Sequence, residues 1–184
     1  MGPCVGPYRT TANGWHALRP DRANGYVPTV IATDDPRSDD VRALLERHLA
    51  FADATTPRED VHALDVDALL DPRVTFVSYR VDGEVLGVAA LKRLDDEHAE
   101  IKSMHTAQEA RGRGIGRALV DHLVGLARER GHRRLSLETG SGPAFAPARA
   151  LYAGAGFTPC GPFAGYRPSP NSAYLTLALD PPPA

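Results

Sequence analysis

The sequence predicts an α/β (α+β) fold, in which a mixed, mostly antiparallel central sheet of six to seven strands is flanked by helices. Three observations support this prediction. Strand-like runs with a period of two follow one another along most of the chain. Amphipathic segments with a three-and-four spacing are interleaved with them. The dipeptide Asp82-Gly83 between two such runs indicates a hairpin, and therefore an antiparallel pair.

Length and composition indicate one globular domain. The chain has 184 residues, 42% of them hydrophobic, which is enough for a single core of useful size. The formal net charge of -2 provides no basic field for nucleic acid or a membrane surface. No apolar run reaches the roughly 18 residues of a membrane helix and no leader peptide is recognisable, so we expect a cytoplasmic protein. Cys4 and Cys160 lack metal-ligand or redox spacing, so we expect idle thiols and no metal site.

The first part of the chain is expected to differ from the rest. Residues 1–28 mix Gly, Pro, Asn and Arg without apolar periodicity, which predicts an irregular or disordered leader before a single domain over residues 29–184. A short β-branched strand ends at Thr33, and the following D-D-P suits a helix start. We expect helices over about residues 36–50 and, more briefly, 60–70, where Pro72 ends the second.

The middle of the chain reads as three consecutive strands. VTFVSYRV (74–81) and EVLGVAALKRL (84–94) form the hairpin, and AEIKSMHT (99–106) follows a polar turn. If the side chains of the third strand alternate strictly, they point to two opposite faces of the sheet. One face would carry Ile101, Ser103 and His105, and the other Glu100, Lys102, Met104 and Thr106.

The last third alternates helices with strands. An apolar stripe predicts a helix over residues 116–130, which Gly131 ends. The strand RRLSLET (133–139) and the short helix PARALYAGAG (147–156) follow it. Two further strands are expected near residues 157–160 and 173–179.

The turn R-G-R-G-I-G-R between a strand and a helix predicts an anion site. Its backbone N–H groups and the helix dipole together favour a phosphate, and its arginines add positive charge. The candidate residues are Arg111, Gly112, Arg113, Gly114, Ile115, Gly116 and Arg117. Arg117 stands where a dinucleotide fingerprint needs its third glycine, and the G-K-S/T of a P-loop is absent. A plain glycine-rich loop with solvated arginines and an arginine-glycine RNA-binding segment remain as alternatives.

The hexapeptide Arg111-x-x-Gly114-x-Gly116 resembles the pyrophosphate loop of the GCN5-related N-acetyltransferases, the GNAT family. The AEI strand opening, the R-G-x-G-I-G-x-x-L turn, L-x-L-E-T and A-L-Y-A-G-A-G-F occur in the order of that family. The resemblance covers roughly residues 74 to 179. HALDVDALL and GPFAGYRPSP are also similar to segments of a subgroup of small bacterial acetyltransferases.

The resemblance implies a binding mode for acetyl-coenzyme A (acetyl-CoA), the acyl donor. The turn 111–117 would hold the diphosphate, and the backbone of Met104, His105 and Thr106 would bind the pantetheine arm. The N–H of Met104 would polarise the thioester carbonyl. Many members carry an asparagine where Phe145 stands, so some contacts to the arm are in doubt.

The resemblance also implies an acid and a base. Tyr152 would give a proton to the departing thiolate, although a core aromatic is the alternative interpretation. Glu100 would draw the amine proton through water, although an ion pair with Lys102 explains it equally well. His105, predicted on the opposite strand face, is the weaker candidate for the base.

The sequence therefore indicates an N-acetyltransferase that moves an acetyl group from acetyl-CoA to a primary amine. A small molecule is favoured over a peptide as acceptor, and the amine would attack directly in a ternary complex. The alternative is a catalytically weak acyl-CoA-binding sensor or interaction module. No nucleic acid or membrane partner is expected, and a homodimer stays open because members of the family often dimerise.

Overall fold

The computed structural model describes residues 8–11, 14–17, 29–55, 57 and 65–179. Within the predicted leader it describes two short strands, β1 (Tyr8–Thr11) and β2 (Gly14–Ala17), which pair antiparallel. The other residues before Thr29 lie outside the described part of the chain.

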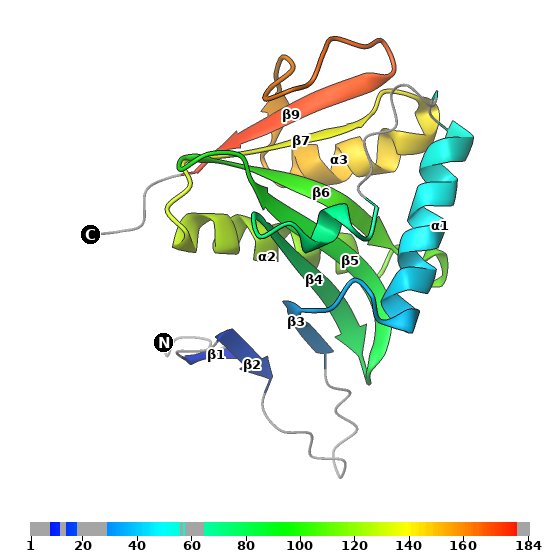
Figure 1. Cartoon of the computed structure of the whole chain (residues 1–184), viewed down its shortest axis with the longest axis vertical. Coiled ribbons are helices and arrows are strands. Elements are labelled where there is room, and N and C mark those ends of the chain that lie inside the picture. Colours follow the sequence, from blue (N-terminus) through cyan, green and yellow to red (C-terminus); the bar gives the residue numbers. More distant parts are fainter. Residues whose placement is uncertain (1–7, 12–13, 18–28, 56, 58–64, 180–184) are drawn as a thin grey trace, which may run out of the picture.

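The centre of the fold is a seven-stranded sheet with the order β3-β4-β5-β6-β7-β9-β8 (Figure 1). Every pair is antiparallel except β6–β7, which is parallel. This confirms the predicted mixed, mostly antiparallel sheet. The strands are β3 (Thr29–Thr33), β4 (Val74–Val81), β5 (Glu84–Arg93), β6 (His98–Thr106), β7 (Arg134–Gly140), β8 (Thr158–Pro159) and β9 (Ser172–Ala178).

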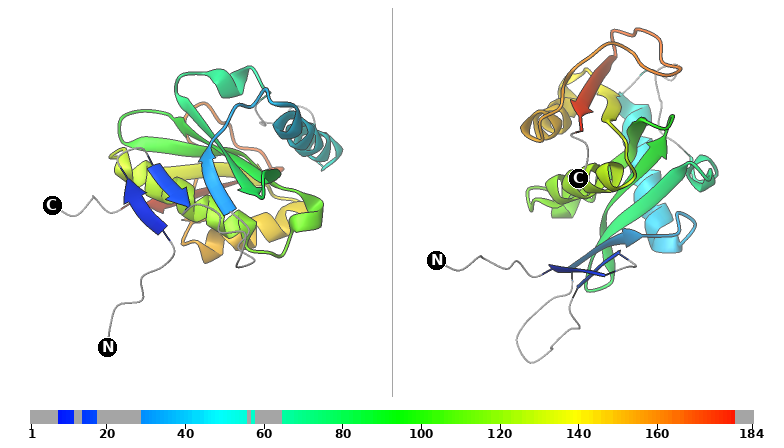
Figure 2. Two further views of the ribbon diagram at one scale, coloured as in Figure 1. Left: turned by 90° about the horizontal axis from the view of Figure 1, so that it is seen from below. Right: turned by 90° about the vertical axis from the view of Figure 1, so that its left-hand side faces the viewer.

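Within the described ranges, three α-helices cover the sheet. Helix α1 (Asp39–Thr55) packs on one face, and α2 (Ile115–Glu129) with α3 (Ala146–Gly154) packs on the other (Figure 2). Short 3₁₀ turns η3 (Ala68–Leu70), η4 (Gln108–Ala110) and η5 (Pro143–Phe145) lie in the connections. The central strand β5 is buried by helices on both faces, which explains its nearly continuous apolar sequence.

Two helix predictions need correction. Helix α1 begins at Asp39 because the Asp35 carboxylate accepts the N–H of Arg37, forming a turn that delays the helix. It continues to Thr55, beyond the predicted end at residue 50. Residues 60–64 of the predicted helix 60–70 lie outside the described residues, and residues 65–70 form a turn and the 3₁₀ turn η3 instead of an α-helix.

The hairpin prediction is confirmed. Strands β4 and β5 pair from Val81↔Glu84 onward, and both turn residues have positive φ angles, 49° at Asp82 and 87° at Gly83. Asp and Gly tolerate this conformation better than other residues, so the dipeptide fixes the hairpin register.

The predicted alternation in β6 is wrong beyond Lys102. Ser103 has a φ of 50°, and the β5–β6 register jumps from Ala90↔Lys102 to Val88↔His105. Two residues of β6 therefore lie opposite the single Ala89, which defines a β-bulge. The bulge moves His105 to the face of Lys102, beside α1, and Met104 to the face of α2.

Helix α2 packs against the sheet through a glycine. It spans almost the predicted range and ends before Gly131, whose φ is 79°. A Cβ added to Gly87 of β5 would lie 2.9 Å from Ile115 Cγ2 and 3.0 Å from Leu119 Cδ1. The close approach of α2 to β5 therefore depends on the absence of a side chain at this position.

The substitution Gly87→Ala should destabilise the protein by about 1 to 3 kcal/mol, because α2 would have to move away from the sheet. The matched control is Gly125→Ala within α2, where an added Cβ meets nothing within 4 Å. That variant should gain about 0.5 to 1 kcal/mol from helix propensity. Urea unfolding measures both, and equal effects of the two substitutions would contradict this packing.

Candidate active site

Strands β6 and β7 diverge in the middle of the sheet. Their parallel pairing runs from His98↔Arg134 to Ile101↔Leu137 and ends there, while β7 stays paired with β9 as far as Gly140. The Ser103 bulge follows the last pair directly, and a bulged strand bends. A cavity of about 500 Å³ lies at this divergence and is lined by both strands.

The cavity brings together most of the residues that the sequence singled out. Those lining it are Met104, His105, Thr106, Arg111, Gly112, Gly114, Ile115, Gly116, Arg117 and Tyr152. The side chains of Glu100 and Arg113 do not line it. Elements that are distant in sequence, from α1 to α3, therefore surround one cavity.

The glycine turn provides backbone donors at one end of the cavity. Gly112 and Gly114 have φ angles of 77° and 80°, and Gly114 is the N-cap residue of α2. No side chain caps this helix, so the N–H groups of its first turn are left for a ligand. Gly116 also lines the cavity, and a Cβ added to it would lie 3.0 Å from Leu151 Cδ2 in α3.

The three arginines of the turn are placed differently. Arg111 lines the cavity. Arg117 also lines it, but its Nε donates to both carboxylate oxygens of Asp121, at 2.8 and 2.9 Å, and an Nη donates to Gly154 O at 3.1 Å. Arg117 therefore ties α2 to the end of α3, whereas Arg113 is exposed outside the cavity.

Tyr152 lines the cavity beside Met104. Its side chain is 6% exposed, packs edge-on against Phe157, and donates a hydrogen bond to Met104 Sδ at 3.5 Å. Burial, with a contribution from the charge of Glu138, raises the pKa of Tyr152 well above its ordinary value. The hydroxyl is therefore protonated at neutral pH, as an acid must be before it acts.

Glu100 belongs to a buried polar cluster beside the cavity. Tyr166 donates its hydroxyl hydrogen to Glu100 Oε1 at 2.5 Å, and Lys102 Nζ donates to Tyr166 Oη at 2.6 Å. Lys102 Nζ lies 3.6 Å from Glu100 Oε1. Burial lowers the pKa of Lys102, against the opposing charges of Glu100 and Glu138. Of the pair, only Lys102 lines the cavity.

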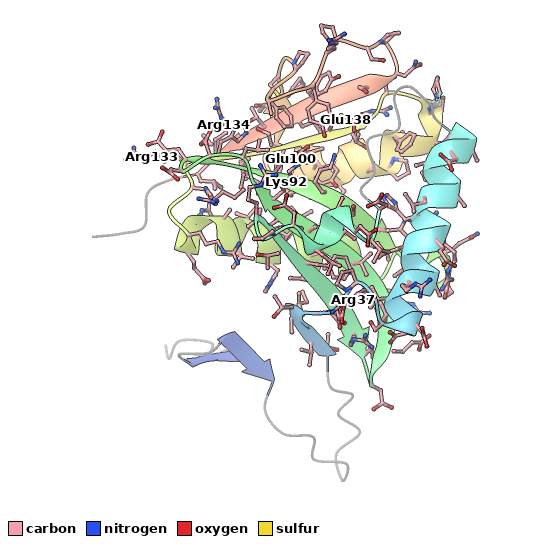
Figure 3. The ribbon with its side chains drawn as sticks, viewed as in Figure 1. Arg37, Lys92, Glu100, Arg133, Arg134 and Glu138 are labelled. Carbon is pink, nitrogen blue, oxygen red and sulfur yellow. The ribbon has the colours of Figure 1, made fainter. Side chains whose placement is uncertain are left out.

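Sequence reasoning missed several cavity residues. Glu138 of β7 lines the cavity, on the neighbouring strand to Glu100 (Figure 3). Ser103 Oγ and His48 Nδ1 are buried and have no hydrogen-bond partner. Glu138 belongs to a strand whose side chains alternate between the two sheet faces, so the face to which it points was predictable. The position of Ser103 at the cavity depends on the bulge.

Two histidines form part of the same wall. His48 of α1 and His105 of β6 have ring centroids 5.2 Å apart. Burial lowers the pKa of each to about 4, and the charge of Lys102 contributes at His48. Both imidazoles are therefore neutral at pH 7.

Phe145 closes the far end of the cavity. Its ring packs edge-on against Phe51 of α1, with centroids 5.3 Å apart. A Cβ on Gly140 would overlap this ring. Arg149 fixes the turn by donating to the carbonyl oxygens of Gly140 and Gly142, at 2.7 and 2.9 Å. The Phe51–Phe145 contact therefore makes this part of the cavity wall apolar.

The fold and this cavity are those of an acyltransferase. Comparison with known proteins identifies the family. Residues 39–157 match the model of the Acetyltransferase (GNAT) family. The chain belongs to this family. As in other GNAT enzymes, the acyl donor is acetyl-CoA and the acceptor is an amine, so the protein is an acetyl-CoA-dependent N-acetyltransferase.

Its relatives include two small bacterial proteins. The uncharacterized N-acetyltransferase YsnE of Bacillus subtilis (strain 168) is 42% identical over 149 residues, which are 81% of this chain and 99% of YsnE. The uncharacterized N-acetyltransferase YedL of Escherichia coli (strain K12) is also 42% identical over 149 residues, covering 81% of this chain and 94% of YedL. These matches confirm the predicted subgroup of small bacterial members.

A solved structure supports the fold. A crystal structure from Klebsiella pneumoniae, assigned to the acyl-CoA N-acyltransferases, has a TM-score of 0.68 and 26% identity. The match covers 83% of this chain and 98% of that chain. In the part of our chain that the structure describes, no helix is long and apolar enough to span a membrane.

The two cavity histidines predict a pH dependence of stability. Their pKa values are depressed to about 4 in the folded protein, from an ordinary value of 6.5. The unfolded chain therefore binds more protons below pH 6.5, and the folded state loses stability as pH falls from 6.5 towards 4. Each histidine should cost on the order of 1 kcal/mol between pH 7.5 and 5.5.

The measurement is urea unfolding at both pH values for the wild type and for His48→Gln. The variant should lose less stability on acidification than the wild type does. An identical pH dependence in the two proteins would show that His48 titrates normally.

Proposed function

We propose that the protein transfers the acetyl group of acetyl-CoA directly to the primary amine of a small molecule while both substrates are bound. The observation that carries this proposal is the divergence of β6 and β7, which joins the glycine turn to the Tyr152 hydroxyl through one cavity. The two faces of the sheet contribute different parts of it. The turn and α3 lie on one face, and α1 with Lys102 lies on the other.

The donor would occupy the side of the cavity formed by α2 and α3. The first-turn N–H groups of α2 and the Arg111 guanidinium suit a diphosphate. Beyond Ile101, the edge of β6 that faces β7 has no strand partner in the sheet, so its backbone at Met104 to Thr106 is available to the amide groups of a pantetheine arm. The N–H of Met104, in the bulged segment, would polarise the thioester carbonyl.

Direct attack is favoured over an acetyl-enzyme intermediate. Ser103 lines the cavity, but its Oγ is buried and has no hydrogen-bond partner, and so no base to activate it. Cys160, the cysteine in the described part of the chain, does not line this cavity. The amine nitrogen would therefore form its bond to the carbonyl carbon as the bond from carbon to sulfur breaks.

Two proton transfers complete the reaction. The Tyr152 hydroxyl would supply the proton for the departing thiolate. Glu138, the carboxylate that lines the cavity, would take the proton that the amine loses. Glu100, which the sequence suggested as the base, would hold Tyr166 and Lys102 in place, because it lies beside the cavity and accepts the Tyr166 hydrogen bond.

The donor site is tested with a matched pair of glycine substitutions. Gly114 and Gly83 have similar φ angles of 80° and 87°, and an added Cβ meets no protein atom within 4 Å at either. Gly114→Ala should raise the Kd for acetyl-CoA about tenfold or more. A tenfold increase corresponds to a loss of about 1.4 kcal/mol in binding free energy. Gly83→Ala, in the distant hairpin, should leave it unchanged. Isothermal titration calorimetry measures both, and unaltered binding by Gly114→Ala would remove the turn from the donor site.

The acid and base are tested by Tyr152→Phe and Glu138→Gln. Each should lower kcat by about 10²- to 10⁴-fold with little change in acetyl-CoA affinity. Tyr79→Phe on β4, outside the cavity, is the control and should behave as wild type. Tight acetyl-CoA binding without free-thiol release for any amine tested would instead indicate a binding module.

A further inference from the structure

A buried ammonium group lies beside two carboxylates on one face of the sheet. Glu100 and Lys102 point to the same face of β6, two residues apart, and their side chains are 3% and 8% exposed. Glu100 pairs with Ser136 of β7, and two residues beyond Ser136 on that face is Glu138 (Figure 3). The strands separate at this level, and Lys102 and Glu138 both line the opening.

The charge of Glu138 acts on several groups around it. Burial lowers the pKa of Lys102, while the carboxylates of Glu100 and Glu138 oppose this effect. Burial is also the main cause of the raised pKa values of Tyr152 and Tyr166, and the charge of Glu138 adds to both. Glu138 therefore lies within electrostatic range of the proposed acid, Tyr152, and of the buried ammonium group.

Tyr166 of the C-terminal loop fixes the position of the ammonium group. Lys102 Nζ donates to Tyr166 Oη at 2.6 Å, and Tyr166 donates to Glu100 Oε1 at 2.5 Å. Burial and the charge of Glu100 raise the pKa of Tyr166, so its hydroxyl stays protonated and donates towards Glu100. The Tyr166 ring packs against Tyr174 of β9, with centroids 5.7 Å apart, which holds it on the sheet.

The other titratable groups that face Lys102 do not supply the same charge. His48 of α1 and His105 of β6 are neutral at pH 7, because burial lowers the pKa of each to about 4. Lys92 of β5 is opposite Glu100 in the register, but it is outside the cavity and only partly buried. Solvent screens such a charge more strongly than a buried one. Lys102 is therefore the cation that the described strands place at the cavity.

Two buried carboxylates that share a site each favour the protonated form of the other. A base that already holds a proton cannot accept one from the amine. Resting on the acetyl transfer proposed above, we propose that Lys102 is a positioning residue, whose ammonium group, held by Tyr166, keeps the Glu138 carboxylate ionised. Glu100 contributes by accepting the hydrogen bond that orients Tyr166. The C-terminal loop thus acts on the base through Lys102.

The first test titrates the Glu138 carboxyl directly and needs no substrate. NMR follows its carboxyl carbon, which is assigned by the loss of the signal in Glu138→Gln, from about pH 8 to pH 5. In Lys102→Met this carboxyl should titrate about one to three pH units higher than in the wild type, because an opposite charge nearby lowers a carboxyl pKa by that much. Lys92→Met is the matched control on the same sheet face, and it should leave the titration nearly unchanged.

A double substitution serves if Lys102→Met does not fold, since that variant leaves the Glu100 carboxylate buried without its cation. Lys102→Met combined with Glu100→Gln removes both charges, and the glutamine still accepts the Tyr166 hydrogen bond. Glu138 should titrate at higher pH in this double variant than in Glu100→Gln alone, because the two proteins differ only in the cation. Tyr166→Phe keeps every charge but releases the ammonium group, so its titration should lie between those of the wild type and Lys102→Met.

Kinetics connect the titration with acetyl transfer. The kcat of Lys102→Met, as a fraction of the wild-type value, should fall further between about pH 7.5 and pH 5.5, because more of the base is then protonated. The Kd for acetyl-CoA should stay unchanged. A variant that had only lost packing would instead show the same fraction at both pH values.

The outcomes separate this inference from the proposed function. An unchanged Glu138 titration in Lys102→Met, or the same kcat fraction at both pH values, would overturn the role of Lys102 while leaving acetyl transfer intact. A Tyr166→Phe titration identical to that of the wild type would contradict the part of the C-terminal loop. The predicted titrations without thiol release for any amine would support the pairing of Lys102 with Glu138 and refute the proposed transfer.

Discussion

The separation of β6 from β7 is the feature on which the rest of the site depends. Elsewhere in the sheet, strands satisfy each other's backbone groups, but beyond Ile101↔Leu137 the two central strands no longer do so. Such a gap between two central strands is stable only if something else occupies it. The Ser103 bulge starts the divergence, and the Gly140 turn, fixed by Arg149, holds β7 on the other side. Helices α1 and α3 then close the opening from opposite faces.

Local chemistry explains why much of the fold could be predicted from the sequence. The hairpin at Asp82-Gly83 and the end of α2 at Gly131 depend on positive φ angles that few residues adopt, so the residue types alone mark them. The turn at Gly112 and Gly114 has the same origin. The order of strands was predictable because consecutive strands in the first half pair with each other.

The errors arose where tertiary geometry overrides a local pattern. A single inserted residue at Ser103 exchanges the sheet faces to which the following side chains point. A serine in the sequence does not predict such a bulge. The prediction that separated His105 from Lys102 was wrong for this reason. Likewise, Glu100 and Glu138 both belong to alternating strands, and only the divergence decides that Glu138 lines the cavity while Glu100 lies beside it.

The central claim is that the coenzyme lies in the divergence with its diphosphate on the glycine turn, and a crystal structure of the complex with coenzyme A tests it most directly. The account predicts the pantetheine arm between Met104–Thr106 and Thr139–Gly140, its sulfur near the Tyr152 hydroxyl, and the diphosphate on the first-turn N–H groups of α2. A coenzyme bound outside this cavity, or a diphosphate held away from Gly112 to Arg117, would contradict it.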